Sequence, residues 1–226
     1  MVKTQSVSKL TRDLLEEDLV MQDAIERRYA NYSSIARILK PKIEERLGRT
    51  VKTVSIVTSV KRAGRGIMQS SSQIRSIIAK SVINVRSDVV KISIEKTRRT
   101  VDLARRLLAE SHEDFLQLSE SISAITLIFD EKILKELLEQ FQGSEILEEQ
   151  RNLGAIIVHS PREIITTPGC AISFYNRISR RRINIEDTVS CYTDTIIVVN
   201  MNEIARAFSA LSDLVNEARI SSTKGS

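Results

Sequence analysis

The residues best suited to chemistry surround a turn near the C-terminal end of the sequence, at 164–169. Pro168 and Gly169 stand there in a chain with only 3 prolines and 7 glycines, and the pattern after them predicts a helix. The first N–H groups of a helix have no partner inside it, so those of Gly169, Cys170 and Ala171 can hold a carboxylate. Glycine at 169 also leaves room for a ligand to approach the backbone.

An ammonium group needs hydrogen-bond acceptors instead. The carbonyl groups of 164–166, or the side chains of Asn184 and Asp187, can supply them. The two sets together predict a pocket for a small zwitterion such as a free amino acid. The alternative is a helix start marked by Pro-Gly that holds no ligand. The residues predicted to bind the ligand are Ile164, Thr166, Thr167, Pro168, Gly169, Cys170, Ala171, Asn184, Ile185 and Asp187.

Other reactive residues form no catalytic or metal-binding set. His112 and His159 have no partners at catalytic or metal-ligand spacing. Two cysteines, Cys170 and Cys191, do not make a disulfide framework and are typical of reduced thiols in a cytoplasmic protein. We therefore expect no enzyme activity, no catalytic residue, no metal and no cofactor.

Composition limits the class of protein. Hydrophobic residues make up 42% of the 226 and charged residues 28%, which is typical of a globular chain. No apolar run is long enough to cross a membrane, and the N-terminus is not a secretory signal. The net charge of +5 is uneven: residues 1–83 hold 16 Lys+Arg and 8 Asp+Glu, or +8, and residues 84–226 hold 18 and 21, or −3. The basic part predicts a polyanionic partner, and the alternative is a merely solvated basic surface.

The basic part has helical spacing almost throughout. Gly48 is placed to end one helix, and 51–63 predicts the next, with Val51, Val54, Val57 and Val60 repeating inward and Ile56 outward. A helix, a turn and a helix with small polar and basic residues on its outer face is what a helix-turn-helix DNA reader needs. The residues predicted to bind DNA are Lys52, Thr53, Ser55, Ser59, Lys61 and Arg62.

The segment 31–62 also resembles part of a group of archaeal-type regulators. Its matching residues are Asn31, Tyr32, Ser33, Ile35, Ala36, Arg37, Ile38, Pro41, Leu47, Gly48 and Val51. The resemblance implies a helix-turn-helix or winged-helix module over 1–66. The alternative is a helical dimerisation module that touches no nucleic acid.

A strand-helix-strand-strand-helix order is predicted twice in the remainder. Glycine and serine cluster at 64–76, and a linker is expected at 67–83, followed by one unit over 84–150 and a second over 151–222. Final strands are expected at 145–150 and 218–222, which completes the βαββαβ, ferredoxin-like plan in each unit. The expected fold class is therefore α+β, with a helical module ahead of two such units.

The stretch "TPGCAISFYNRISRRRINIEDTVS", 167–190, resembles the ACT domain, a regulatory module best known at the C-terminus of aspartate kinases. The match covers 153–218 by residues and 86–142 by pattern only. It implies an effector site made by the helix-start loop and the strand that carries Asn184. The first unit has "EKTRRTVD" at the matching turn and no Pro-Gly, which puts a site there in doubt. Nothing ahead of residue 84 has the Gly-rich phosphate loop of a kinase.

These features predict a ligand-responsive transcription regulator of the cytoplasm. Its expected partners are duplex DNA, an amino-acid effector and a second copy of the chain. One alternative is an ACT-domain oligomerisation or regulatory interaction protein that does not bind DNA. Another is a stand-alone metabolite or nucleotide sensor.

Overall fold

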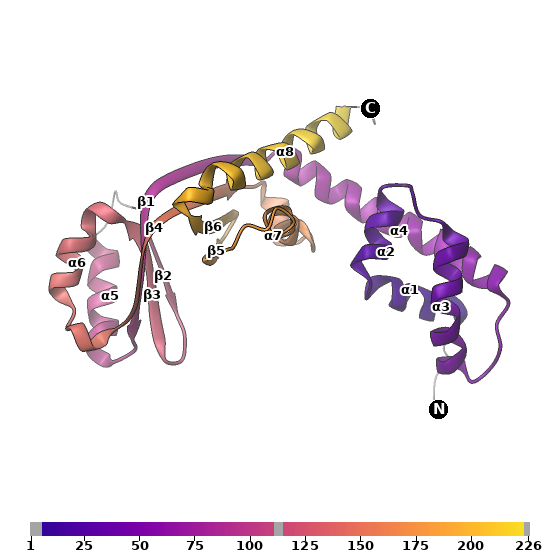
Figure 1. Cartoon of the computed structure of the whole chain (residues 1–226), viewed down its shortest axis with the longest axis horizontal. Helices are drawn as coiled ribbons and strands as arrows, with labels where there is room; N and C mark the ends of the chain where they lie inside the picture. Colours follow the sequence, from indigo (N-terminus) through magenta and orange to yellow (C-terminus); the bar gives the residue numbers. More distant parts are fainter. Residues whose placement is uncertain (1–5, 111–114, 224–226) are drawn as a thin grey trace. The chain divides into compact units, whose positions relative to one another are not determined.

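The computed structural model describes residues 6–110 and 115–223. The contacts divide the chain into two compact units, 1–74 and 75–226, which we call the helical unit and the sheet unit (Figure 1). Among the described residues, no helix is both long and apolar enough to cross a membrane.

The helical unit is built from four helices around one apolar core. Side chains of Ser6, Asp18 and Asn31 accept hydrogen bonds from backbone N–H groups and so begin the first three helices. Gly48, with φ of 64°, ends the third, as its sequence position predicts. The helices are α1 (Val7–Glu16), α2 (Leu19–Glu26), α3 (Tyr32–Leu47) and α4 (Thr53–Ala79).

Helix α4 continues through most of the segment that we expected to be a linker at 67–83. Gly64 and Gly66, just ahead of that segment, do not interrupt the helix. Gly64 serves packing, since a Cβ on it would stand 3.0 Å from Cγ2 of Ile25. The boundary between the two compact units lies between residues 74 and 75, inside this helix. The linker prediction was therefore wrong, and the expected boundary of the first module at residue 66 falls within α4.

The sheet unit holds six antiparallel strands in the order β2-β3-β1-β4-β6-β5. The predicted order strand, helix, strand, strand, helix is confirmed in both repeats. The elements are β1 (Val82–Glu95), α5 (Arg98–Glu110), β2 (Leu116–Glu120), β3 (Ala124–Asp130), α6 (Leu134–Gln140), β4 (Ile146–His159), α7 (Cys170–Ser179), β5 (Asp187–Cys191), β6 (Asp194–Asn200) and α8 (Ile204–Thr223).

Strands β1 and β4 belong to both repeats. In the first repeat, 89–95 of β1 pairs with β3 and with the start of β4. In the second repeat, 153–159 of β4 pairs with β6 and with 82–86 of β1. The fourth strand of the second repeat is thus the beginning of β1. The strand expected at 218–222 was wrong, because these residues continue α8, where Val215 and Ala218 are buried.

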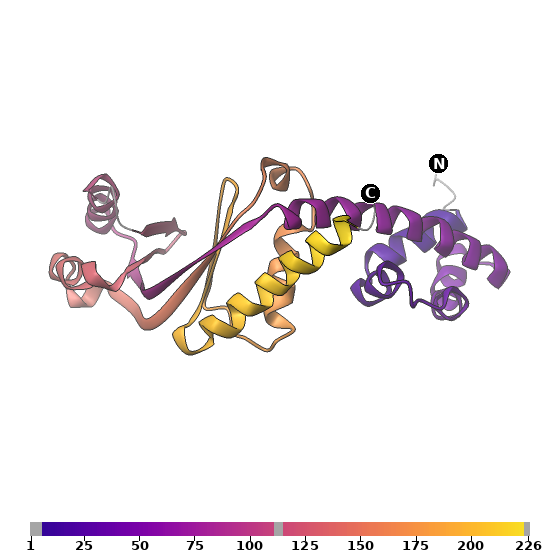
Figure 2. The same cartoon turned by 90° about the horizontal axis from the view of Figure 1, so that it is seen from above.

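The two shared strands are irregular at the point where one repeat gives way to the other. Asp88 of β1 and Asn152 of β4 have positive φ, 54° and 58°, and the register shifts beside each of them. Residues 87 and 88 together face the partner strand where one residue would be expected, so the alternation of side chains changes face there. Figure 2 shows both strands running from the part of the sheet near α5 and α6 to the part near α7 and α8.

Two cores follow from this change of face. Val90, Ile92 and Ile94 pack against the buried side of α5 and α6. Val89 points the other way, into a second core that joins both repeats. That core consists of Val89, Phe115, Ile128, Leu153, Ala155, Ile196 and Val198.

Candidate functional site

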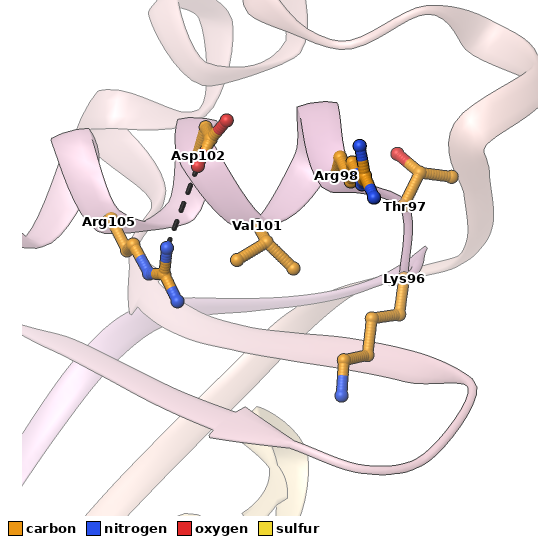
Figure 3. Close-up of a pocket in the computed structure, with 6 residues that line it drawn as sticks. All are labelled: Lys96, Thr97, Arg98, Val101, Asp102 and Arg105. Atoms are coloured by element: carbon orange, nitrogen blue, oxygen red, sulfur yellow. Dashed lines mark ion pairs between the residues drawn. The ribbon is translucent and has the colours of Figure 1, made fainter.

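A cavity of about 480 Å³ lies at the start of α5, in the first repeat. It occupies the turn that matches the predicted site of the second repeat, and Figure 3 shows the side chains around it. Three of them are cations and one is a carboxylate. The lining residues are Lys96, Thr97, Arg98, Val101, Asp102 and Arg105.

The first turn of α5 is held by two threonines. The N–H of Thr97 donates to Oγ1 of Thr100 at 2.8 Å, and the N–H of Thr100 donates to Oγ1 of Thr97 at 3.2 Å. The N–H groups of Arg98 and Arg99 have no acceptor in the described part of the chain. The start of α5 therefore offers two free donors beside the cavity, where the helix dipole also favours an anion.

The charged side chains around the cavity differ in how they are paired. Lys96 Nζ lies 2.6 Å from Oε1 of Glu120, and this hydrogen bond and charge hold the pKa of Glu120 below its usual value. Arg105 lies 3.6 Å from Asp102, and both side chains are exposed, so this pair is weak. Arg98 has no ion pair with any described residue. Figure 3 shows Arg98 at one end of the cavity and the Arg105–Asp102 pair at the other, with Val101 between them.

The predicted turn of the second repeat has the expected backbone. Gly169 has φ of 91° and caps α7, and Ser173 Oγ donates to its carbonyl at 2.7 Å. Cys170 is buried, and burial raises the pKa of its thiol. Pro168, Gly169 and Thr166 are exposed, while Ile164, Thr167 and Ala171 are half-buried. The turn is uncharged from Ile164 to Ala171, in contrast to the start of α5.

Asn184, Ile185 and Asp187 do not join that turn. Asp187 pairs with Val198, which pairs in turn with Ala155 of β4. Strand β4 ends at His159, four residues further on, or about 13 Å along the strand. The chain leaves for Gly169 from that far end.

The contacts of the chain before α7 and after it agree with this arrangement. Ser160 donates its N–H to Thr193 O, at the β5–β6 turn. The other end of α7 is held where α8 begins, because Arg206 donates to the carbonyl of Arg181 at 3.0 Å. A helix that joins parallel strands starts at one end of the sheet, and the next strand starts at the other. Within one chain, the predicted ligand residues therefore form two separate groups, and expecting a single pocket was wrong.

The second group contacts the first repeat instead. Lys91 of β1, only 9% exposed, donates to Glu186 O at 3.2 Å and lies 3.7 Å from Asp187 Oδ2. Its third partner is Glu148, at 3.9 Å. Asn184 donates to Glu186 Oε1 at 2.9 Å, so one N–H of its amide is already engaged. These residues connect the two repeats.

The predicted DNA-binding residues lie at the start of α4 and along it. Lys52, Ser55, Lys61 and Arg62 are exposed, and Thr53 is half-buried. Ser59 is buried and donates its hydroxyl to Ser55 O at 2.9 Å, so its outward placement was wrong.

Two apolar residues of α4 exchange places relative to the sequence prediction. Val54 is 75% exposed and Ile56 is fully buried. A repeat of three residues drifts by about 60° at each step around a helix of 3.6 residues per turn, so the four valines cannot share one face. The outer face also contains Thr58 and Arg65, which the sequence prediction missed. Counting positions at 100° per residue would have found both.

The cavity at α5 was missed for another reason. The sequence prediction was based on Pro-Gly, and the matching turn of the first repeat has no such pair. The cations of Lys96, Arg98 and Arg105, directly after a predicted strand, were the signal that could have located it. No described group of three or more His, Cys, Asp or Glu side chains is placed to hold a metal ion.

The paired βαββαβ repeats and their shared sheet have an ACT-type fold, as the resemblance implied. Aspartate kinase from Synechocystis superposes with a TM-score of 0.51 at 14% identity, over 61% of this chain and 27% of that one. The regulatory subunit of aspartate kinase from Thermus thermophilus gives 0.48 at 12%, over 58% and 95%. Aspartate kinase from Clostridium acetobutylicum gives 0.48 at 18%, and the match covers 34% of that enzyme's length. No protein-family model and no curated protein sequence matches the chain.

Proposed function

We propose that the protein is a ligand-responsive transcription regulator. The helical unit binds duplex DNA, and the ACT-type repeats bind a small carboxylate effector of the amino-acid class. The observation that carries the proposal is the outer face of α4, which exposes cations and small polar side chains and has no carboxylate.

The charge of this face is set by the sequence around it. No aspartate or glutamate occurs between Glu45 and Asp88, so α4 has no acidic residue of its own. Lys61, Arg62 and Arg65 are exposed and form no ion pair with any described residue. Lysine and arginine that are left unpaired on one helix face can neutralise DNA phosphates and release counterions.

The effector is assigned to the cavity at α5. Its carboxylate would bind the N–H groups of Arg98 and Arg99 and the guanidinium of Arg98. Its ammonium would bind Asp102, whose pair with Arg105 is weak enough to be exchanged. The Gly169 turn remains a second candidate, for a ligand held by backbone groups alone.

Binding of the full-length protein to duplex DNA tests the first half of the proposal. Fluorescence anisotropy over a salt series should give an affinity that falls steeply as salt rises. The triple variant Lys61→Ala/Arg62→Ala/Arg65→Ala should lower the salt slope by up to about three. The matched control is Lys9→Ala/Arg12→Ala/Lys135→Ala, which removes the same charge from exposed positions elsewhere. Equal losses in both variants would mean that net charge alone attracts DNA.

A thermal-shift screen of the twenty amino acids tests the second half. A ligand at about 100 times its Kd adds roughly 2.7 kcal/mol to the free energy of unfolding. Arg98→Gln should weaken the hit, whereas Thr167→Val, at the other turn, should not. The reverse result would place the effector at Gly169. Effector binding without DNA binding at low salt would identify the interaction protein that is the alternative function.

A further inference from the structure

Val54 is the feature of the outer face of α4 that phosphate binding does not explain. It lies in the first turn of the helix, which begins at Thr53, and its side chain is 75% exposed. The apolar residues that hold α4 in the core, Ile56 and Val60, are both fully buried on the opposite face. Val54 therefore contributes nothing to this core and presents two methyl groups to solvent.

The neighbours of Val54 show what kind of surface surrounds it. Ser55 and Thr58 are exposed on the same face. Thr58 donates its hydroxyl to Val54 O at 3.0 Å, so its hydrogen is used within the helix. On this face Val54 and Thr58 therefore present methyl groups beside the hydroxyl of Ser55.

Lys52 is exposed directly before the helix, and the other cations of this face, Lys61, Arg62 and Arg65, stand further along it. Eight residues separate Val54 from Arg62, which at 1.5 Å per residue is about 12 Å, close to the width of the major groove. A helix placed with Val54 at the base edges would thus bring Arg62 and Arg65 to the phosphates. Phosphate contacts position a protein on DNA, and contacts to base edges give it sequence preference.

We infer that Val54 contacts the 5-methyl group of a thymine and makes the protein prefer that base. In helix-turn-helix proteins the N-terminal residues of the reading helix meet the base edges. The thymine methyl is the apolar group that the major groove displays, and valine has no polar atom with which to read any other base. This inference rests on the proposed binding of DNA by α4.

Removal of that methyl group from the DNA tests the inference. Duplexes selected from a random library by the full-length protein are resynthesised with deoxyuridine in place of one thymidine at a time. Deoxyuridine pairs as thymidine does and lacks only the methyl group. Burial of one such group contributes about 0.8 kcal/mol, so one position should lose about fourfold in affinity. In Val54→Ala, the same substitution should have little or no effect.

The variants are chosen so that the fold is kept. Alanine has a higher helix propensity than valine, and Val54 is exposed, so Val54→Ala should not unfold α4. The control Ile38→Ala removes a side chain of α3 that is 60% exposed, and it should keep the fourfold discrimination.

Each of the other outcomes overturns either the role of Val54 or the proposed binding of DNA. Binding with no position sensitive to deoxyuridine overturns the role of Val54 and leaves DNA binding standing, as does equal sensitivity in Val54→Ala. A change in sedimentation of Val54→Ala with unchanged discrimination would show that Val54 contacts protein instead. No DNA binding at low salt overturns the proposed function, and the inference with it.

Discussion

Lys91 Nζ lies 3.7 Å from Asp187 Oδ2, and this contact joins the two ACT-type repeats. Lys91 stands on the part of β1 that belongs to the first repeat, and Asp187 begins β5 of the second. Arg86 forms the converse contact from the other side of the bulge. Its guanidinium lies 3.0 Å from Asp130 of β3 and 5.5 Å from the ring centre of Phe115. Two cations of one strand thus tie each repeat to the other.

Lys91→Met should lower the free energy of unfolding of the sheet unit by about 1–3 kcal/mol. The change removes a buried ammonium with three oxygen partners, and it leaves the carboxylates of Glu148 and Asp187 without their cation. Both carboxylates keep some access to water, which limits the loss. Urea unfolding followed by circular dichroism measures it. Lys135→Met, on the exposed side of α6, is the control, and an equal effect in both variants would contradict the role of Lys91.

Gly154→Ala should destabilise the protein by about 1–3 kcal/mol through overpacking. A Cβ there would stand 2.8 Å from Ile204 Cδ1 and 3.3 Å from Arg86 O. Since Cδ1 is the closer atom, Ile204→Val should recover part of the loss in the double variant. Thermal unfolding gives both values, and a double variant less stable than Gly154→Ala would show that the backbone contact dominates.

Gly66→Ala is the matched glycine substitution with the opposite expected sign. Gly66 lies inside α4, and no heavy atom is within 4 Å of the position of its Cβ. Alanine should therefore stabilise the helix by roughly 0.5–1 kcal/mol. A loss of stability would indicate that this part of α4 contacts another molecule.

The buried thiol of Cys170 should make the stability of the protein depend on pH in the alkaline range. Burial raises the pKa of the Cys170 thiol above its ordinary value of 9.0, so the folded state keeps a proton that the unfolded state loses. The contribution of the protonated Cys170 thiol to the free energy of unfolding is fully present below pH 9.0. It is lost as pH rises through the higher folded pKa. Cys170→Ala should flatten the fall in stability at alkaline pH. At pH 8, a thiol reagent should modify exposed Cys191 first, and equally rapid reaction at both cysteines would contradict the burial of Cys170.

The protein should be at least a dimer at micromolar concentration. The sheet ends in two five-residue strands, β2 and β5, whose outer edges are unpaired among the described residues. Such edges are commonly covered by another chain. Light scattering measures the mass directly, and a monomer at this concentration would contradict the expectation.

Local patterns were enough to predict the elements of the sheet unit. Alternation in "DVVKISIE" and helical spacing in "RRTVDLARRLLAE" each reflect a core contact made by that element alone. Strand sharing could not be predicted in this way. The beginning of β1 becomes the fourth strand of the second repeat through pairs such as Val82 with His159, which are far apart in sequence. A strand was predicted at 218–222 because the local sequence does not indicate that the beginning of β1 already fills that place in the sheet.

The candidate site shows the same limit. The helix start at Gly169 was predicted from Pro-Gly, and its positive φ agrees with the choice of glycine. Adding Asn184 and Asp187 to it required the direction of the strands, which nothing local specifies. The prediction of which α4 residues are exposed was wrong where a period of three was taken for a helical period. Val54 was therefore placed inside and Ile56 outside.

The continuous course of β1 and β4 through both repeats also restricts how this chain can be divided by a protease or a gene fusion. A break between Ser87 and Asp88 would separate 82–86 from the repeat in which 89–95 lies, and neither fragment would correspond to one repeat. Domains usually part at linkers crossed by few contacts, and no such linker lies between these repeats. We therefore expect insertions and recombination to be tolerated in the exposed hairpin turn at Ser121–Ser123 and to be harmful in the middle of either long strand.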